Sequence, residues 1–160
     1  MDFREKFAIS LDYIFGKGVS SVLPLERLEF SFSKRTGKVK TISLDDRLLA
    51  TIRSNGSIAL TVYGAGLLVK HRGFQGNCVV VEEGPDKFVA EGRSVFARHV
   101  VSCGDRVRPA SDVVILDVTG KVIAVGKAVL SAKMMRGFDR GMAVKVRESI
   151  GKRTAGEVNA

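Results

Sequence analysis

Several residue types are scarce in this sequence. Its 160 residues contain no tryptophan, two cysteines, two histidines and three prolines. Cys78 and Cys103 form no Cys-x-x-Cys pair and have no nearby histidine that would complete a zinc set, so we expect both to be structural thiols in a reducing compartment. His71 and His99 also stand alone, and no Ser-His-Asp arrangement is visible. The sequence therefore predicts no metal, no cofactor and no catalytic triad.

Long apolar runs are missing as well. No stretch approaches the ~20 residues that a membrane-spanning helix needs. The first residues lead into a charged amphipathic segment, whereas a signal peptide has an apolar core and a cleavage site. We therefore expect a protein without a membrane partner, located in the cytoplasm.

Basic residues outnumber acidic ones throughout the chain. There are 26 Lys and Arg against 17 Asp and Glu, which gives a formal net charge of +9. Residues 1–76 hold 12 basic and 7 acidic side chains and the remainder holds 14 and 10, so the excess is +5 and +4. A charge shared by both halves favours a surface for a polyanion such as RNA. The alternative, a protein that is merely basic and soluble, stays open on charge alone.

The first half predicts one helix and two hairpins. Apolar residues at helical spacing define one face of an N-terminal helix, which Gly16 ends; they are Phe3, Phe7, Leu11 and Ile14. Alternating apolar and polar residues predict strands at 28–32, 39–44, 48–53 and 58–62. An Asn-Gly pair at 55–56 is a strong turn signal for the second hairpin.

The first predicted hairpin is strongly basic. Residues 33–40 (SKRTGKVK) place Thr36 and Gly37 at the turn, with cations on both sides. Lys34, Arg35 and Lys38 are therefore candidate ligands of RNA phosphates. Solvated lysines on an edge hairpin also protect against aggregation, and this second interpretation stays open.

Two other local features in this half are interpreted as structural. Residues 64–71 (GAGLLVKH) predict a short helix, and its GAG lacks the spacing of a nucleotide-binding loop. We interpret these glycines as close packing of a helix against strands. The acidic pair Asp45-Asp46 is interpreted as a turn in preference to an acid–base pair.

The second half is organised around residues 92–147. Residues 92–100 (GRSVFARHV) predict a glycine turn that feeds a short basic helix with Ser94 as its N-cap. The amides of Ser94 and Val95 would then meet an anion, while Arg93 and Arg98 pair with phosphates. Short strands rich in Val and Ile follow at 108–117, 121–132 and 141–148, separated by turn residues.

This second half resembles the PUA domain, an RNA-binding module. The motifs GRSVFA (92–97), RPASDV (108–113), AVG (124–126) and GMAVKVR (141–147) are similar, in this order, to the PUA domain at the C-terminus of archaeal tRNA-guanine transglycosylase, the archaeosine enzyme. One departure is Ala110-Ser111, where the family often has Gly followed by an acidic residue. This departure affects a turn.

The first half resembles the small domain that precedes the PUA module in the same archaeal family. The similar segments are DYIFGKG (12–18), SKRTGKVK (33–40), LLATIRSNGSIALT (48–61) and GA (64–65). Together with the patterns above, the resemblance implies an α+β N-terminal domain at 1–75, with helices packed on a small antiparallel sheet. A mainly β PUA pseudo-barrel at 76–150 and a flexible tail at 151–160 follow.

The resemblance does not extend to the catalytic part of the family. The transglycosylases carry a large barrel with two catalytic aspartates and a zinc site, and such a barrel needs about 200 residues. These 160 residues have no room for it. We therefore expect no enzyme activity from this chain by itself.

The resemblance implies that the PUA half binds the acceptor stem and single-stranded 3′ end of tRNA. The candidate residues are Gly92, Arg93, Ser94, Phe96, Ala97, Arg98, Lys127, Lys145 and Arg147. Gly92 would allow close backbone approach, and Phe96 would stack on an unpaired base. Two alternatives stay open: Phe96 belongs to the core, and Lys145 and Arg147 are only the solvated face of a strand.

Three functions remain possible at this stage. The first is an RNA-binding subunit that works in tRNA modification with a separately encoded transglycosylase catalytic chain. The second is an independent PUA-containing factor of translation or ribosome maturation. The third is a protein-interaction module without RNA binding, because a fold alone does not fix a function.

Overall fold

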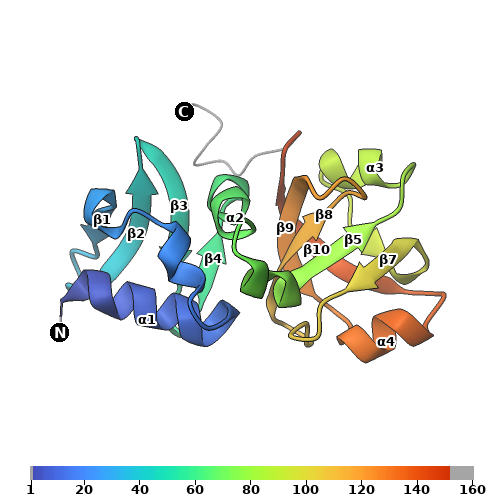
Figure 1. The fold of residues 1–160 in the computed structure, drawn as a ribbon, viewed down its shortest axis with the longest axis horizontal. Coiled ribbons are helices and arrows are strands. Elements are labelled where there is room, and N and C mark those ends of the chain that lie inside the picture. Colours follow the sequence, from blue (N-terminus) through green and yellow to red (C-terminus); the bar gives the residue numbers. More distant parts are fainter. Residues whose placement is uncertain (1, 152–160) are drawn as a thin grey trace. The chain divides into compact units, whose positions relative to one another are not determined.

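The structure is a computed structural model that describes residues 2–151. Its contacts cluster into two compact units that divide between Phe74 and Gln75 (Figure 1). The predicted flexible tail lies outside the described residues except for Gly151. Each unit is described by itself below.

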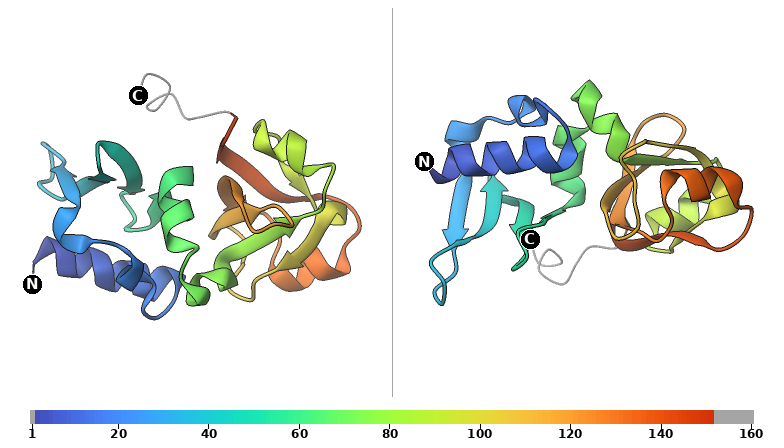
Figure 2. Two further views of the ribbon diagram at one scale, coloured as in Figure 1. Left: turned by 45° about the horizontal axis from the view of Figure 1, so that its top comes forward. Right: turned by 90° about the horizontal axis from the view of Figure 1, so that it is seen from below.

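The first unit is a four-stranded antiparallel sheet with helices packed on it. The strands run in the order β1-β2-β3-β4, and α1 crosses them (Figure 2). This is the predicted combination of helices and a small antiparallel sheet. The elements are α1 (Phe3–Phe15), η1 (Val19–Val22), η2 (Leu25–Arg27), β1 (Glu29–Phe32), β2 (Val39–Leu44), β3 (Arg47–Ile52), β4 (Ile58–Leu60), α2 (Val62–Leu68) and, at the boundary between the units, η3 (Arg72–Asn77).

The N-terminal helix forms where its apolar periodicity predicts it. The side chain of Asp2 caps α1 by accepting a hydrogen bond from the amide of Arg4 at 3.3 Å. Apolar side chains four positions apart are buried; they are Phe7, Leu11 and Phe15. The helix ends at Gly16, whose φ of 140° is a conformation that other residues rarely adopt.

Both predicted hairpins are present in the first unit. In the basic hairpin, Gly37 has φ 72° and its amide donates to the Ser33 carbonyl at 2.8 Å. The second hairpin turns at Asn55-Gly56. Asp45 and Asp46, with φ of 52° and 61°, form the tight turn between β2 and β3. The interpretation of this acidic pair as a turn is therefore confirmed.

In the GAG segment, Gly64 is a packing feature, as interpreted from the sequence, whereas a Cβ atom at Gly66 would meet nothing within 4 Å. Gly64 lies in α2 and presses against β3, where a Cβ atom would lie 2.3 Å from the Leu49 carbonyl oxygen. The side-chain oxygen of Thr61 caps the helix by accepting from the Gly64 amide at 3.0 Å. The same hydroxyl donates to the Leu48 carbonyl at 2.6 Å. Only glycine fits this contact between helix and strand.

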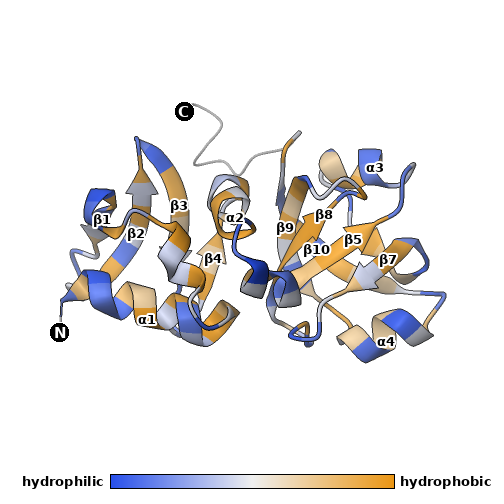
Figure 3. Ribbon diagram, viewed as in Figure 1, coloured by the Kyte–Doolittle hydropathy of each residue, from blue (hydrophilic) through white to orange (hydrophobic). Residues whose placement is uncertain are grey.

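The second unit is mainly β and barrel-like, as the resemblance implied. Its six strands follow the order β6-β10-β9-β8-β5-β7, with β5 parallel to β8 and the other pairs antiparallel. β5, β8 and β9 are apolar along most of their length (Figure 3). The elements are β5 (Cys78–Val81), α3 (Asp86–Ala90), β6 (Val95–Phe96), η4 (Ala97–His99), β7 (Val100–Cys103), β8 (Asp112–Leu116), β9 (Val122–Ala128), α4 (Ala132–Gly137) and β10 (Met142–Ser149).

The core of the second unit explains the Val- and Ile-rich strands. β-Branched side chains pack well on a pleated sheet, and those of Val79, Ile115 and Val144 are completely buried. Both cysteines are buried and reduced, in line with a structural role. At the turn before β8, Ala110 has φ 70°, a conformation that costs an alanine free energy and would suit glycine.

Candidate nucleic-acid interface

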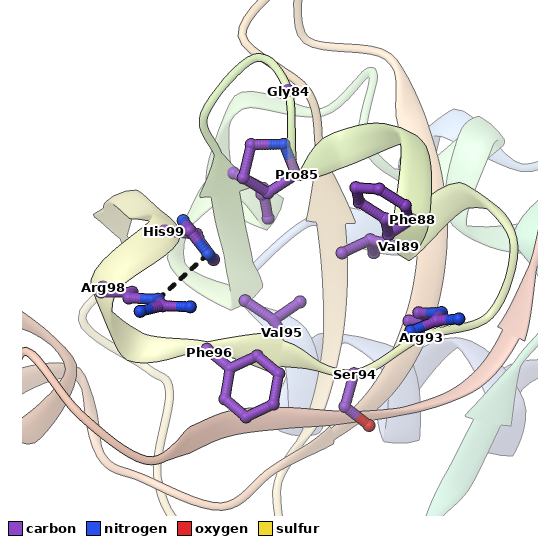
Figure 4. Close-up of a pocket in the computed structure, with 11 residues that line it drawn as sticks. Gly84, Pro85, Phe88, Val89, Arg93, Ser94, Val95, Phe96, Arg98 and His99 are labelled. Carbon is purple, nitrogen blue, oxygen red and sulfur yellow. Dashed lines mark hydrogen bonds between the residues drawn. The ribbon is translucent and has the colours of Figure 1, made fainter.

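A pocket opens on one side of the second unit. Its cavity volume is about 500 Å³. The walls come from the end of β5, from α3 and from the segment that leads through β6 into η4 (Figure 4). The lining residues are Val81, Gly84, Pro85, Phe88, Val89, Arg93, Ser94, Val95, Phe96, Arg98 and His99.

Two aromatic rings are exposed at this pocket. The side chain of Phe88 is 56% exposed and that of Phe96 is 47% exposed. The core alternative for Phe96 is therefore wrong. Exposed rings beside a cavity are available for stacking on a planar ligand such as a nucleobase.

Two arginines add positive charge to the same pocket. The guanidinium carbon of Arg93 lies 5.8 Å from the ring centroid of Phe88, within the range of a cation–π contact. On the other side, Nε of Arg98 donates to Nε2 of His99 at 3.3 Å. The structure thus brings together four of the predicted residues, namely Arg93, Ser94, Phe96 and Arg98.

The predicted helix with Ser94 as its N-cap is wrong. Val95 and Phe96 form the short strand β6, which pairs with Val144 and Met142 of β10. Only one 3-10 turn, η4, follows. The amides of Ser94 and Val95 therefore offer no helix N-terminus to an anion. The physical reason is tertiary, because the β-branched Val95 buries its side chain in the core and a strand edge satisfies this backbone.

Two further predicted residues, Ala97 and Gly92, have structural roles in this segment. The side chain of Ala97 is only 3% exposed and belongs to the core, and its amide donates to the Gly141 carbonyl at 2.9 Å. Its side chain is therefore not available to RNA, which corrects its place among the predicted contacts. Gly92 has φ 106°, so the predicted glycine turn is present, and it connects α3 to the pocket segment instead of feeding a helix.

The predicted cations on β9 and β10 lie outside this pocket. Lys127 and Lys145 are exposed and stand directly opposite one another in the β9–β10 ladder. On its other side, Lys127 stands opposite Asp112 in the β8–β9 ladder, so a carboxylate also lies beside this pair of cations. Arg147 is exposed two positions further along β10, where the register shifts between Val146 and Glu148.

The cations of the basic hairpin lie on the first unit. Lys34, Arg35 and Lys38 are all exposed between β1 and β2. Lys38 also lines a groove of about 560 Å³ between α1 and the two hairpin tips. The other residues of this groove are Phe3, Lys6, Phe7, Ser10, Phe32, Gly37, Val39, Ile52, Gly56 and Ile58.

Sequence reasoning missed Phe88, Glu82 and the role of His99. The expectation that His99 stands alone is wrong, because its Nδ1 lies 2.7 Å from Oε1 of Glu82. These two residues are 17 positions apart, and only strand pairing brings them together. For Phe88, the one available signal is an aromatic residue in the polar segment EEGPDKF.

The structure gives no support for a metal centre or a membrane span. Within residues 2–151, no group of three or more His, Cys, Asp or Glu side chains is arranged to hold a metal ion. Over the same part of the chain, no helix is long and apolar enough to cross a membrane. Burial raises the pKa of Cys78 to about 12, and the nearby Cys103 contributes to this shift, so the Cys78 thiol is not a ready metal ligand or nucleophile.

Comparison with protein families assigns both units. Residues 9–74 match the patch-forming domain C2 of tRNA-guanine transglycosylase, and residues 77–150 match the PUA domain. The chain joins a transglycosylase C2 domain to a PUA domain. It is similar to the tRNA-guanine(15) transglycosylases of Methanothermobacter thermautotrophicus, at 32% identity over 149 residues, and Methanobrevibacter smithii, at 34% over 152 residues.

Each match covers most of this chain but only a small part of the transglycosylase. The matches take in 92% and 94% of this chain but only 23% of each transglycosylase, so the chain spans about a quarter of their length. Solved structures confirm the fold. A hypothetical protein from Pyrococcus horikoshii has a TM-score of 0.71 at 22% identity, covering 91% of this chain and 89% of that chain. A conserved PUA domain protein from Thermoplasma acidophilum has a TM-score of 0.60 at 22% identity, covering 95% and 93%.

Proposed function

We propose that this C2–PUA chain binds tRNA and acts in tRNA modification, with the PUA domain holding the acceptor stem and the single-stranded 3′ end. One observation carries the proposal: two exposed aromatic rings and two arginines surround one pocket of about 500 Å³. Unpaired RNA is usually bound by stacking of its bases and by cations along its backbone, and this pocket offers both.

The chemistry of the pocket suits a short unpaired strand. A base stacks on Phe96 or Phe88, while Arg93 and Arg98 pair with the flanking phosphates. Lys127, Lys145 and Arg147 extend the basic surface for the adjoining duplex, where contacts to phosphates supply most of the affinity. The basic hairpin of the C2 domain, with Lys34, Arg35 and Lys38, adds a second polyanion-binding surface.

The proposal is tested by a salt titration of tRNA binding. Full-length tRNA and the same tRNA without its 3′ end are each titrated with wild type and Arg93→Ala. We expect intact tRNA to bind more tightly, and Arg93→Ala to weaken that binding and lower the salt slope by about one unit, because one phosphate contact is lost. The Ala variant also removes the cation–π contact with Phe88.

A matched variant serves as the control. Lys121→Ala removes an exposed cation of the same domain that does not line the pocket, and we expect it to change both tRNAs alike. Equal binding of intact and shortened tRNA by all variants would mean that the basicity of the chain acts diffusely and that the pocket is not a 3′-end site.

We propose further that the chain is non-catalytic and works beside a separate transglycosylase catalytic chain. The 23% of the relatives that it matches falls on the C2 and PUA domains, which supports a non-catalytic role for these two domains. Size-exclusion chromatography with the catalytic barrel from the same organism should yield a complex of the two chains. A separate activity assay should show that this complex exchanges guanine in tRNA faster than the barrel alone. Tight tRNA binding without complex formation would instead favour an independent factor of translation or ribosome maturation.

A further inference from the structure

We propose that Glu82 and His99 form a hydrogen-bond relay that positions Arg98 for RNA, so that an acidic residue just outside the pocket lining strengthens the binding of an anion. This inference rests on the proposed function. Glu82 lies outside the motifs that predicted the site, and His99 lies within GRSVFARHV (92–100) but was not among the predicted contacts. The relay makes them positioning residues, because neither needs to touch the ligand.

The backbone places the two residues opposite one another. β5 and β7 are paired with Val81 facing Val100, and beyond this pair the amide of Glu82 donates to the carbonyl of His99 at 3.0 Å. Glu82 and His99 are therefore neighbours across the paired backbones that extend the β5–β7 ladder, and their side chains start close together. The pairing of the two backbones holds these side chains close to one another, so their contact does not depend on the random motion of surface groups.

The hydrogen bonds determine which imidazole nitrogen carries the proton. Nε2 of His99 accepts from Nε of Arg98 at 3.3 Å, so Nε2 carries none. The ring proton then sits on Nδ1 and is donated to Oε1 of Glu82 at 2.7 Å. Glu82 thereby selects the tautomer that Arg98 needs.

The relay leaves Arg98 able to bind a phosphate. Only its Nε is engaged, so the two terminal nitrogens of the guanidinium still present a fork of donors. A direct pair with Glu82 would instead place a carboxylate on that fork. The imidazole of His99 instead accepts from Nε alone, which holds the arginine in place without using these donors; Figure 4 shows this hydrogen bond between Arg98 and His99.

The relay and simple electrostatics predict opposite changes in RNA affinity when the Glu82 carboxylate is removed. By charge alone, removing the Glu82 carboxylate beside the pocket should strengthen RNA binding. If the relay holds Arg98, Glu82→Ala should weaken binding by about two- to tenfold, because an ordered side chain becomes mobile. Glu82→Gln removes the charge but keeps an acceptor for Nδ1, so it should bind within about twofold of wild type.

The experiment measures tRNA affinity at one salt concentration for these variants, with and without Arg98→Ala. Glu83→Ala is the matched control, since Glu83 is the exposed neighbour outside the relay, and its binding should be equal or tighter. In the Arg98→Ala background, Glu82→Ala should no longer weaken binding. Equal or tighter binding of Glu82→Ala in the parent, or a loss in Glu82→Gln as large as in Glu82→Ala, would overturn the relay.

A second measurement tests the relay without RNA. Long-range ¹⁵N–¹H spectra of the free protein report the tautomer of His99, and we expect the proton on Nδ1 in wild type and Glu82→Gln. A proton on Nε2 in wild type would overturn the relay whatever the RNA results are. Absence of tRNA binding by wild type, with the proton on Nδ1, would refute the proposed function and leave the relay geometry standing.

Discussion

Alanine substitutions at two glycines of one helix should change the stability of the C2 domain in opposite directions. In α2, Gly64 packs against β3, and a Cβ atom there would lie 2.3 Å from the carbonyl oxygen of Leu49. A Cβ atom at Gly66, two positions later, would meet nothing within 4 Å. Gly64→Ala should therefore destabilise the C2 domain, whereas Gly66→Ala should stabilise it.

The magnitudes follow from what surrounds each position. Relief of the clash at Gly64 needs a shift of about 1 Å between helix and strand, because a carbon and an oxygen need about 3.3 Å. The Leu49 carbonyl already accepts the amide of Thr61 at 2.9 Å and its hydroxyl at 3.1 Å, so this shift also strains the cap. We expect Gly64→Ala to lower the free energy of unfolding by about 3 kcal/mol. Gly66→Ala should raise it by about 0.5–1 kcal/mol through helix propensity.

The tyrosines of this chain provide an intrinsic fluorescence probe for the unfolding of the C2 domain. It has no tryptophan and two tyrosines, Tyr13 and Tyr63, both in the C2 domain. Tyrosine fluorescence during thermal unfolding therefore reports this domain alone. A change of 1 kcal/mol moves the Tm of a domain of this size by about 4–8 °C, so Gly64→Ala should lower it by at least about 10 °C. Equal Tm changes in the two variants, or a stable Gly64→Ala, would refute the packing argument.

Three further predictions concern the PUA domain. Phe96→Ala should weaken binding of unpaired RNA by about 1–3 kcal/mol, whereas Val101→Ala, at an exposed position outside the pocket, should not. Ala110→Gly should raise the unfolding free energy in urea by about 1 kcal/mol by relieving φ 70°. Burial raises the pKa of Cys78 from its ordinary value of 9.0 to about 12, so the unfolded chain loses this proton first and the free energy of unfolding should fall by up to about 1.4 kcal/mol per pH unit above pH 9; urea titrations of Cys78→Ala should lack this component.

Much of the fold was predictable because its signals are local. The apolar spacing in α1, the patterns that predict the strands β1 and β2 and the turn glycines all act within a few residues, and the structure contains these elements. Burial alternates along β2 but not along β1, where Phe32 is 47% exposed. The packing interpretation of the GAG segment is wrong for Gly66 but correct for Gly64, since the absence of a phosphate-loop spacing is visible in the sequence. Its partner on β3, the Leu49 carbonyl, was not.

The candidate site was predictable only in part. Arg93, Phe96 and Arg98 were singled out and lie at one pocket, but the helix expected to carry them is the strand β6. The motif does not reveal this, because β6 exists only through pairing with β10, whose Met142 lies 46 positions beyond Phe96. A segment this short takes its conformation from its neighbour in space.

By itself, the sequence determined where α1, α2 and the turns of the first unit lie, that both halves are basic and that they carry C2 and PUA motifs. These properties depend on neighbouring residues and on composition. Only the tertiary structure decided that Phe88 and Phe96 are exposed together, that Ala97 is buried and that Glu82 reaches His99. Exposure and hydrogen bonding at the pocket depend on how distant strands pair, and a single sequence does not contain that register.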